Sequence, residues 1–217
     1  MIRGNFITFE GGDGVGKSTQ IRRLENRLRV GGLECVTTRE PGGTPFAERV
    51  RDFILASNLP AHPAMAEALL FAAARYDHVE NLIKPALSEH KWVLCDRFSD
   101  STRAYQGAAG GVDRSSLVQL EALTHESCTP DLTLILDLDP SEGRARIASR
   151  RSADASNDGD PFEARDLAFQ ARLREAFLDI AAEEPGRCRI IDAGAGPDAV
   201  EEAIWKVVAR RFRLGTD

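Results

Sequence analysis

The amino-acid sequence predicts an α/β fold in which helices flank a five-stranded, mostly parallel sheet. Three observations support this prediction. Strand-like and helix-like segments alternate along the chain. Two of the strand-like runs are continuously apolar and end in a carboxylate, as expected for strands that are covered on both faces. A glycine-rich loop with a phosphate-binding consensus separates the first strand from the first helix, which is the arrangement of the P-loop NTPase fold.

The expected strands are short runs rich in β-branched and apolar residues. In chain order they are Phe6–Glu10, Glu34–Thr38, Trp92–Asp96, Leu132–Asp137 and Arg189–Asp192. Between them, apolar residues recur at helical spacing. The expected helices contain the segments Ile21–Leu28, Ala64–Ser88, Leu117–Leu123, Phe169–Ile180 and Val200–Val208. Right-handed crossovers between successive strands then produce a parallel sheet in one domain that spans residues 1–217.

Composition limits the cellular setting and the partners of the protein. The net charge of −6 argues against a nucleic-acid partner, because a surface that binds nucleic acid is normally basic. No apolar stretch reaches the roughly 18 residues that a membrane span needs, and the first residues lack the features of a secretory signal. We therefore expect a cytoplasmic protein without a membrane partner. The four scattered cysteines form no zinc motif, and buried thiols are expected at Cys35, Cys95 and Cys188.

The segment Gly11–Ser18 (GGDGVGKS) satisfies G-x-x-x-x-G-K-[ST]. Its glycines let the backbone curl so that successive N–H groups point at phosphate oxygens. Lys17 is expected to reach the β- and γ-phosphates of a nucleotide, and the Ser18 hydroxyl to bind Mg²⁺. The nucleotide-binding residues expected here are Gly11, Gly12, Asp13, Gly14, Val15, Gly16, Lys17, Ser18 and Thr19. The sequence has no N-K-x-D guanine motif, but a P-loop alone does not separate kinases from other ATPases.

Two strands end in an acid that could bind the same metal ion. Asp96 is the preferred candidate because Arg97 follows it, and an arginine can bridge the phosphates of donor and acceptor. Asp137 is the competing candidate. A carboxylate that only caps a strand end is the alternative explanation for either residue.

Further segments have the residue types of a second nucleotide site and of a cover for it. Arg39–Thr44 (REPGGT) follows the second strand, where loops line the ligand crevice of a parallel sheet, although an ordinary turn is the alternative. Phe71 and Arg75 share a helix face, which suits stacking on a nucleobase and hydrogen bonding to it; a core position is the alternative for Phe71. The polar segment Ser152–Asp160 is either a surface loop or a lid, placed at about 150–162.

As a group, these segments resemble the thymidylate kinase family. The shared motifs are FEGGDGVGKSTQ, TREPGGTP, LLFAAARYDHVENLIKPAL, DRFSDSTRAYQG and LDLDP, in the family's order and approximate spacing. The resemblance covers residues 6 to about 183, and the later RCRIIDA is similar to the family's last strand. It implies ATP-dependent phosphorylation of dTMP to dTDP, which would supply dTTP synthesis, with Mg²⁺ as cofactor. It also implies a homodimer.

The resemblance further implies roles for individual residues on the acceptor side. Phe71 would stack on thymine, Arg75 would bind a base carbonyl, and Thr102 would face the base edge. Tyr105 would occupy the space of a ribose 2′-hydroxyl, and Asp13 would approach the 3′-hydroxyl. Arginines would surround the acceptor phosphate, namely Arg39, Arg51 and Arg97. The full set expected around the acceptor is Arg39, Glu40, Pro41, Arg51, Phe71, Arg75, Arg97, Ser101, Thr102, Tyr105, Gln106 and Glu163.

On the donor side, the resemblance implies that Arg146 lies over the adenine. It points to the bacterial variety of the family, in which the lid supplies a catalytic arginine, because the P-loop has Gly14 where other members have an arginine. Arg150 and the neighbouring Arg151 are available for this role. The family often has an arginine at the far end of the lid, where this chain has Pro161. The candidate replacement is Arg165.

The expected reaction is an in-line phosphoryl transfer. It needs no strong general base, because a phosphate oxygen is already a nucleophile. Catalysis would rest on positioning and charge neutralisation by Mg²⁺ and by the expected catalytic residues Lys17, Arg97, Arg150 and Asp13. Two alternatives stay open at this stage: a kinase for another pyrimidine monophosphate or a deoxynucleoside, and a P-loop switch or ATPase that binds partners.

Overall fold

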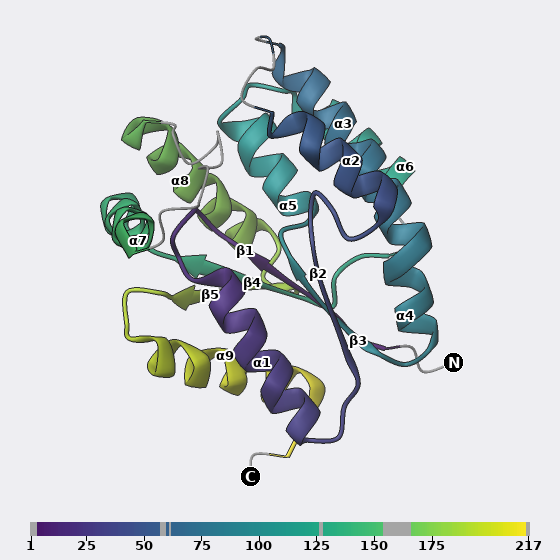
Figure 1. Ribbon diagram of the computed structural model, residues 1–217, viewed down its shortest axis with the longest axis vertical. Coiled ribbons are helices and arrows are strands. Elements are labelled where there is room, and N and C mark those ends of the chain that lie inside the picture. The colour runs from purple at the N-terminus through teal and green to yellow at the C-terminus, as the bar shows by residue number, and fades with distance from the viewer. Residues whose placement is uncertain (1–3, 57–59, 61, 126–127, 154–165, 216–217) are drawn as a thin grey trace.

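In the computed structural model, which describes residues 4–56, 60, 62–125, 128–153 and 166–215, five strands form one parallel sheet (Figure 1). The strands are β1 (Phe6–Glu10), β2 (Cys35–Arg39), β3 (Trp92–Asp96), β4 (Leu132–Asp137) and β5 (Cys188–Asp192). They lie in the order β2-β3-β1-β4-β5, and each ladder between neighbours is parallel. The predicted fold class is confirmed. β2 lies one residue later than predicted, and β5 begins one residue earlier.

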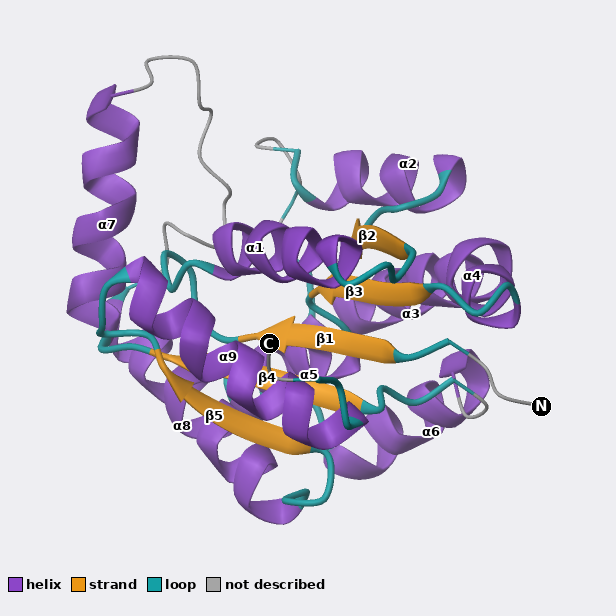
Figure 2. Ribbon diagram, turned by 90° about the horizontal axis from the view of Figure 1, so that it is seen from below, coloured by secondary structure: helices purple, strands orange, loops and turns teal. Residues whose placement is uncertain are grey.

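Helices cover both faces of the sheet, which gives three layers (Figure 2). α1 (Lys17–Val30) and α9 (Pro197–Phe212) pack against one face, and residues 79–88 and α8 (Leu167–Glu183) pack against the other. The remaining helices are α2 (Pro45–Ile54), α3 (Ala64–His78), α4 (Lys84–Ser88), α5 (Ser99–Thr102), α6 (Arg114–His125) and α7 (Pro140–Ala153). Two segments are π-helical, η1 (Val79–Ile83) and η2 (Arg103–Ala108).

Alternation along the strands divides the core between the two faces. In β1, Ile7 packs with Leu24 of α1 and Ile204 of α9, whereas Phe6 packs with Ile83 on the opposite face. Phe6 and Ile7 are fully buried, and burying such a side chain contributes about 1.5–3 kcal/mol to the stability of the fold. All four cysteines are buried free thiols, in agreement with the prediction made for three of them.

The segment Ala64–Ser88 follows one helical path, as predicted, but its hydrogen-bonding pattern changes along the way. α3 passes into η1 and then into α4. Pro85 has no N–H to donate to the carbonyl of Asn81, so the α-helical ladder is interrupted near this point. Among the described residues, α2 and the region of α5 with η2 were not predicted from apolar periodicity. For α2 a local signal exists, because Thr44 caps the helix by accepting from the N–H of Ala47 at 3.2 Å, with proline in the first turn.

The topology brings three chain segments together at one edge of the sheet. β1, β2 and β3 are parallel neighbours, and Asp96 at the end of β3 pairs in register with Arg39 at the end of β2 and with Phe9 of β1. The loops that follow these strands therefore start side by side, at the carboxyl edge where parallel sheets bind ligands. No helix within the described ranges is both long and apolar enough to cross a lipid bilayer.

Candidate functional site

A cavity of about 330 Å³ opens at this carboxyl edge. Its walls come from the P-loop, α2, α3 and the segments that follow β2 and β3. The residues expected around the acceptor that line it are Arg39, Glu40, Pro41, Arg51, Phe71, Arg75, Arg97, Ser101, Thr102, Tyr105 and Gln106. The residues expected for the nucleotide, metal or catalysis that line it are Asp13, Gly14, Gly16, Lys17, Ser18, Thr19, Asp96 and Arg150. Leu55 and Phe98 also line the cavity and were not predicted.

The P-loop holds its lysine against its own backbone. Gly16 has a φ of +99°, which L side chains rarely adopt, and α1 begins directly after it. The unbonded N–H groups of the first turn of α1 therefore face the cavity. The ammonium of Lys17 donates to the carbonyls of Gly12 and Gly11, at 2.7 and 3.2 Å. Burial, together with the positive charge of Arg97, lowers the pKa of Lys17 to about 8.

The two residues predicted to bind a metal ion are in contact. The hydroxyl of Ser18 donates to a carboxylate oxygen of Asp96 at 2.9 Å. Asp137, the competing acid, instead accepts two hydrogen bonds from Arg174, at 2.6 and 2.9 Å. The geometry therefore favours Asp96. A hydroxyl and a carboxylate at the mouth of a P-loop are the oxygen ligands that Mg²⁺ prefers.

Arg97 lines the cavity and contacts both the P-loop and Tyr105. Its guanidinium donates to Asp13 at 2.6 Å and to the Gly11 carbonyl at 3.0 Å, and it lies 5.1 Å from the centre of the Tyr105 ring. The backbone of Arg97 has a φ of +67°, a strained conformation for a residue with a side chain that tends to occur at functional sites. Burial raises the pKa of Asp13, but the charges of Arg97 and Lys17 outweigh this effect and hold that pKa below its usual range.

Glu10 supports this region and was not identified from the sequence. It is fully buried at the end of β1, and it accepts from the Phe98 N–H at 2.7 Å and from the Ser101 hydroxyl at 2.6 Å. Burial and the nearby Asp100 carboxylate raise the pKa of Glu10 to about 8. A signal was present, because Glu10 is an acid that ends an apolar strand, as Asp96 and Asp137 do.

A buried group of polar side chains fixes Arg75. Glu40 accepts from Arg75 at 2.8 Å and from His78 at 3.0 Å, and the guanidinium of Arg75 also donates to the Thr102 hydroxyl at 3.0 Å. Burial raises the pKa of Glu40, but the positive charge of Arg75 and the hydrogen bond from His78 outweigh it, and the net shift is downward. Arg75 is thus held by an ionised partner before any ligand arrives. His78 was not predicted to take part.

Other cavity residues lie at its rim and its far end. Arg51 donates to the Pro41 carbonyl at 3.0 Å, and Arg39 forms an exposed ion pair with Glu48 at 3.1 Å. At the far end, the Gln106 amide donates to Glu67 at 3.1 Å. The cavity thus combines arginines with aromatic and amide side chains along its walls.

Helix α7 contributes an exposed arginine to the wall of the cavity. Arg150 is exposed near the end of α7 and lines the cavity, whereas Arg146 is half-buried and does not line it. α7 packs directly on the P-loop, since a Cβ atom on Gly14 would lie 2.3 Å from the carbonyl oxygen of Gly143. Gly11, Gly12 and Val15 line a separate pocket between the P-loop, α7 and α8.

Several expected residues lie outside the described structure. The expected lid at about 150–162 begins in the last turn of α7 and continues into residues 154–165, which are outside the described residues. Pro161, Glu163 and Arg165 fall in that segment, and the side chain of Arg151 is also not described.

Comparison with known proteins gives one consistent family. The thymidylate kinase family model matches residues 9–204. A thymidylate kinase of Bradyrhizobium sp. (strain BTAi1 / ATCC BAA-1182) is 53% identical over 210 residues, which cover 97% of this chain and 92% of the relative. A thymidylate kinase of Rhodopseudomonas palustris (strain TIE-1) is 52% identical over 214 residues, which cover 98% of this chain and 91% of the relative.

A solved structure agrees with the sequence relatives. The crystal structure of thymidylate kinase from Ehrlichia chaffeensis superimposes with a TM-score of 0.74 and 37% sequence identity. The alignment covers 94% of this chain and 98% of that chain.

Proposed function

This chain belongs to the thymidylate kinase family, and from this premise we propose how its cavity phosphorylates dTMP to dTDP with ATP as the phosphate donor. The family assignment carries the reaction itself. The assignment of roles to residues is our proposal, and it rests on the cavity at the carboxyl edge of β1, β2 and β3. We also propose that residues 1–217 form one kinase domain, because strands from Phe6 to Asp192 join a single sheet.

The far part of the cavity is proposed to bind thymine. Phe71 supplies an aromatic face, and the guanidinium of Arg75 lies four residues away on the same side of α3. The fixed position of Arg75 is the observation that carries this proposal. Its guanidinium donates to the Glu40 carboxylate at 2.8 Å and to the Thr102 hydroxyl at 3.0 Å, and the side chain still borders the cavity. A fixed donor beside an aromatic plate suits the carbonyl edge of a pyrimidine. Gln106 borders the same part of the cavity.

The sugar and the acceptor phosphate are proposed to lie closer to the P-loop. Tyr105 donates to Asp13 at 3.4 Å, so the ring that would exclude a 2′-hydroxyl lies beside the acid that would meet the 3′-hydroxyl. Arg39, Arg51 and Arg97 line the adjoining wall, and guanidinium groups bind phosphate in a bidentate manner. Together they would neutralise the phosphate of dTMP before it approaches ATP.

The transfer step then needs little more than alignment and charge. An oxygen of the dTMP phosphate forms a bond to the γ-phosphorus, the bond from that phosphorus to the β,γ-bridging oxygen breaks, and ADP leaves. Lys17 would turn from the loop carbonyls to the phosphates, and Arg97 would contact both reacting groups. Stabilisation of this kind is commonly the largest single contribution to catalysis.

Mg²⁺ is proposed as the cofactor. Ser18 and Asp96 are the residues that would hold it, since their oxygens already lie 2.9 Å apart at the end of the P-loop. When bound, the ion would neutralise charge on the phosphates of ATP.

Arg150 is proposed as the catalytic arginine supplied by α7. Gly14 cannot carry that group in this arrangement, because any side chain there would collide with the backbone of Gly143. Arg150 borders the cavity from α7, whose backbone packs on the P-loop at this glycine contact. The position therefore allows a guanidinium to approach the transferred group. Arg146 is proposed to lie over the adenine.

The test of the reaction is a coupled ADP-release assay with ATP, Mg²⁺ and a panel of acceptors. The panel contains dTMP, dUMP, UMP, dCMP, AMP, GMP and thymidine. We expect rapid turnover that is highest with dTMP. A maximum with another acceptor would overturn the proposed base-binding roles, and ADP release without any acceptor would overturn the proposed transfer.

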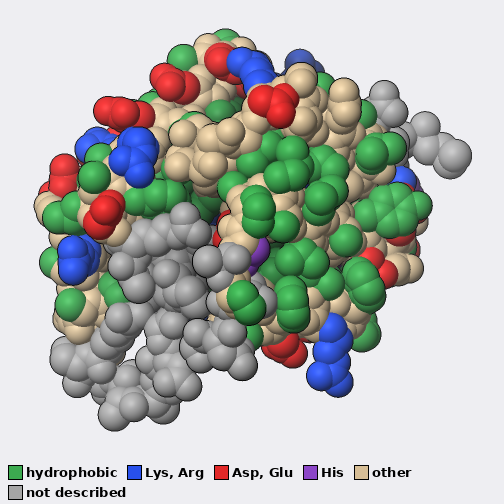
Figure 3. Space-filling view, turned by 90° about the horizontal axis from the view of Figure 1, so that it is seen from above, with side chains coloured by type: hydrophobic (Ala, Val, Ile, Leu, Met, Phe, Trp, Pro, Cys, Tyr) green, Lys and Arg blue, Asp and Glu red, His purple; other side chains and the backbone are tan. Residues whose placement is uncertain are grey.

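A homodimer formed through α2, α3 and α6 is also proposed. Phe46, Tyr76 and Leu123 are 52%, 54% and 73% exposed, and they line one apolar groove between these helices. Figure 3 looks onto this end of the molecule and shows hydrophobic side chains gathered on one face. A second copy is the occupant that the family assignment favours, and a two-fold axis would let this face cover itself.

The enzyme is further proposed to act in the cytoplasm, since buried free thiols suit a reducing compartment.

Light scattering tests the dimer. Wild-type protein should have twice the chain mass of 23.7 kDa, and Leu123→Glu should have the mass of one chain. Val30→Glu is the matched control, because Val30 is 91% exposed on α1, away from the groove. A single-chain mass for the wild type would contradict the proposal.

A further inference from the structure

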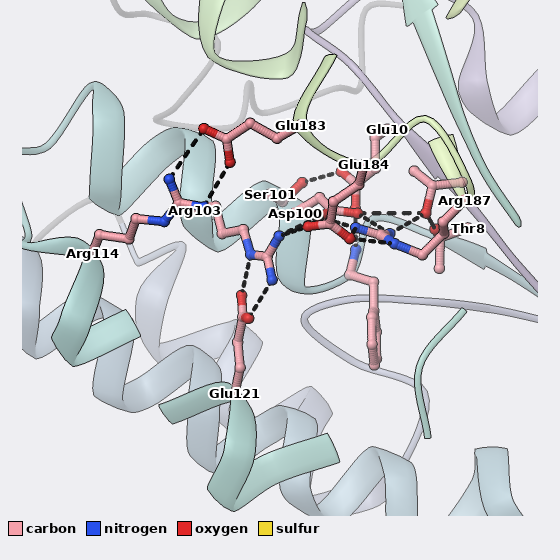
Figure 4. Close-up of polar contacts among 12 residues, drawn as sticks. Thr8, Glu10, Asp100, Ser101, Arg103, Arg114, Glu121, Glu183, Glu184 and Arg187 are labelled. Atoms are coloured by element: carbon pink, nitrogen blue, oxygen red, sulfur yellow. Dashed lines mark hydrogen bonds and ion pairs between the residues drawn. The ribbon is translucent and has the colours of Figure 1, made fainter. Parts of the chain in front are cut away.

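The segment after β3 has one face in the cavity and another in the protein interior. Ser101, Thr102 and Tyr105 line the cavity. Asp100 and Arg103, which are three residues apart and share the other face, do not line it. Figure 4 shows that these two side chains meet acidic and basic residues from distant parts of the chain. The function proposed above uses only the cavity face.

Asp100, which follows β3, pairs with Arg187, which precedes β5. Asp100 is fully buried, and both of its carboxylate oxygens accept from the Arg187 guanidinium, at 2.6 and 3.0 Å. Arg187 also donates to the Thr133 hydroxyl at 2.6 Å, and Thr133 lies 2.8 Å from the Thr8 hydroxyl. The pair is thereby fixed to β4 and β1. Arg187 directly precedes β5, 87 residues from Asp100 in the chain.

The ionic contacts continue to two further helices (Figure 4). Arg187 also pairs with Glu184 at 2.8 Å, and Glu184 accepts a hydrogen bond from Arg103. Arg103 in turn donates two hydrogen bonds to Glu121 of α6, each 2.5 Å long. Asp100, Arg103, Glu121, Glu184 and Arg187 therefore form one network, which clamps the segment after β3 between α6 and the end of α8.

Ser101 and Thr102, which follow Asp100 in the chain, connect it to residues that line the cavity. Ser101 donates to Glu10 at 2.6 Å and accepts from Arg97 at 3.2 Å, and Thr102 accepts from Arg75. A displacement of Asp100 would therefore move groups that border the acceptor. Arg103 also lies 3.6 Å from the Asp100 carboxylate, but both short hydrogen bonds from a cation come from Arg187. A buried carboxylate that loses these bonds is destabilised where it stands, so we expect it to move or to take up a proton.

We infer that Arg187 is a positioning residue for the acceptor: by pairing with the buried Asp100, it sets the place of Ser101 and Thr102 and thereby the affinity for the nucleoside monophosphate. Arg187 does not line the cavity and touches no reacting group. This inference rests on the acceptor site proposed above. Among the described residues, no hydrogen bond or ion pair joins the five network residues directly to the P-loop or to α7, and the nearest link runs through Ser101 and Arg97. The effect should therefore fall mainly on the acceptor.

The experiment is steady-state kinetics on Arg187→Met, with dTMP and ATP varied separately. We expect the KM for dTMP to rise about 10- to 100-fold, the range seen when a reacting group is displaced by a remote change. The KM for ATP should stay within about twofold of the wild-type value. Arg114→Met is the matched control, because Arg114 makes a similar double contact with Glu183 in the same region but is 76% exposed. It should leave both KM values unchanged.

A double variant separates positioning from general loss of structure. In Asp100→Asn/Arg187→Met the buried carboxylate that has lost Arg187 is replaced by a neutral amide, so the KM for dTMP should return toward the wild-type value. Arg187→Lys, which keeps the charge but not the fork, should give an intermediate KM. If Arg187→Met does not fold, these two variants carry the test. Equal rises in both KM values, or a double variant no better than Arg187→Met, would overturn the inference.

The outcome can be distinguished from failure of the acceptor site itself. Arg75→Met, which changes a residue that borders the cavity, should also raise the KM for dTMP. If Arg75→Met has no effect, the proposed acceptor site is wrong. If Arg75→Met raises the KM and Arg187→Met does not, only the role of Arg187 is wrong.

Discussion

The acceptor wall of the cavity and helix α7 hold their arginines in contrasting ways. On the acceptor wall, Arg75 and Arg97 are buried or nearly so, and each is paired with a carboxylate, at 2.8 and 2.6 Å. On α7, Arg150 is exposed, and within the described ranges no carboxylate is paired with it. Arg75 and Arg97 are thus held by paired charges, whereas Arg150 presents its cation to solvent.

This difference shows where structure is organised before substrates bind. Buried pairs keep their geometry, since separating them would leave a charge without a partner in a medium of low polarity. An exposed arginine keeps many rotamers, and its ion pairs contribute little to stability. The acceptor wall is therefore expected to govern substrate affinity and stability together, whereas Arg150 is expected to govern the rate of transfer alone.

The largest effect is expected from Arg97, which belongs to the acceptor wall but also contacts the P-loop. Arg97→Ala should lower kcat by about 10³- to 10⁵-fold, as loss of an arginine that neutralises a transferred phosphoryl group does. Arg97→Lys should recover part of this rate, because it restores charge without the planar fork. The measurement is the ADP-release rate at saturating ATP and dTMP. A near-normal rate for Arg97→Ala would remove Arg97 from the reaction.

The next effect tests the α7 side of the comparison. Arg150→Ala should lower kcat by about 10²- to 10³-fold, the usual range for one group that stabilises developing charge. The KM for dTMP and the melting temperature should not change, because the side chain is exposed and no carboxylate among the described residues pairs with it. Arg210→Ala is the control, since Arg210 is exposed on α9 and lines neither this cavity nor the pocket between the P-loop, α7 and α8. A large rise in the KM for dTMP would contradict the proposal that Arg150 affects the rate of transfer and not the affinity for dTMP.

Arg75→Met tests the acceptor wall, with two readouts that should move together. The KM for dTMP should rise about 10- to 100-fold, and the free energy of unfolding should fall by about 3–5 kcal/mol because Glu40 is left buried without its cation. Kinetics and urea unfolding measure the two effects. If the KM rises without loss of stability, the pair with Glu40 is weaker than its geometry indicates.

A smaller effect is expected from pH, and it concerns Lys17 between the two regions. Lys17 binds phosphate only when protonated, and burial lowers its pKa to about 8 in the nucleotide-free protein. Activity therefore declines as pH rises: kcat/KM for ATP should fall about threefold between pH 7.5 and 8.5, and kcat should fall less because bound phosphates favour the charged form. Glu10 has a pKa of about 8 too. If Lys17→Arg keeps the same decline, the titrating group is Glu10.

The sequence predicts this architecture well where the signal is local. β3 and β4 are continuous apolar runs, and β1 is rich in β-branched and aromatic residues. The observed bounds of all three strands match the predicted ones. The P-loop is a contiguous motif whose residues meet because they are neighbours. Phe71 and Arg75 share a wall because helical spacing places them there. α2 was missed because only its cap, Thr44, and not its apolar pattern, signals it.

The contacts that support the cavity could not be predicted in this way. Glu10 contacts Ser101, Glu40 contacts Arg75, and Asp100 contacts Arg187, which are pairs separated by 91, 35 and 87 residues. Glu40, Arg75 and Ser101 were expected near the acceptor, but no pattern in the sequence indicated which residues they contact. Only the order of the strands brings the two members of a pair together, so their burial and pairing emerge from the topology.

The most direct test of the contrast is calorimetric titration of dTMP into nucleotide-free wild-type, Arg75→Met and Arg150→Ala proteins. If the acceptor wall is already organised, dTMP binds the wild type without ATP, Arg150→Ala binds it equally well, and Arg75→Met binds it about 10- to 100-fold more weakly. A wild type that binds dTMP only when an ATP analogue is present, or an Arg150→Ala variant as impaired as Arg75→Met, would contradict the account.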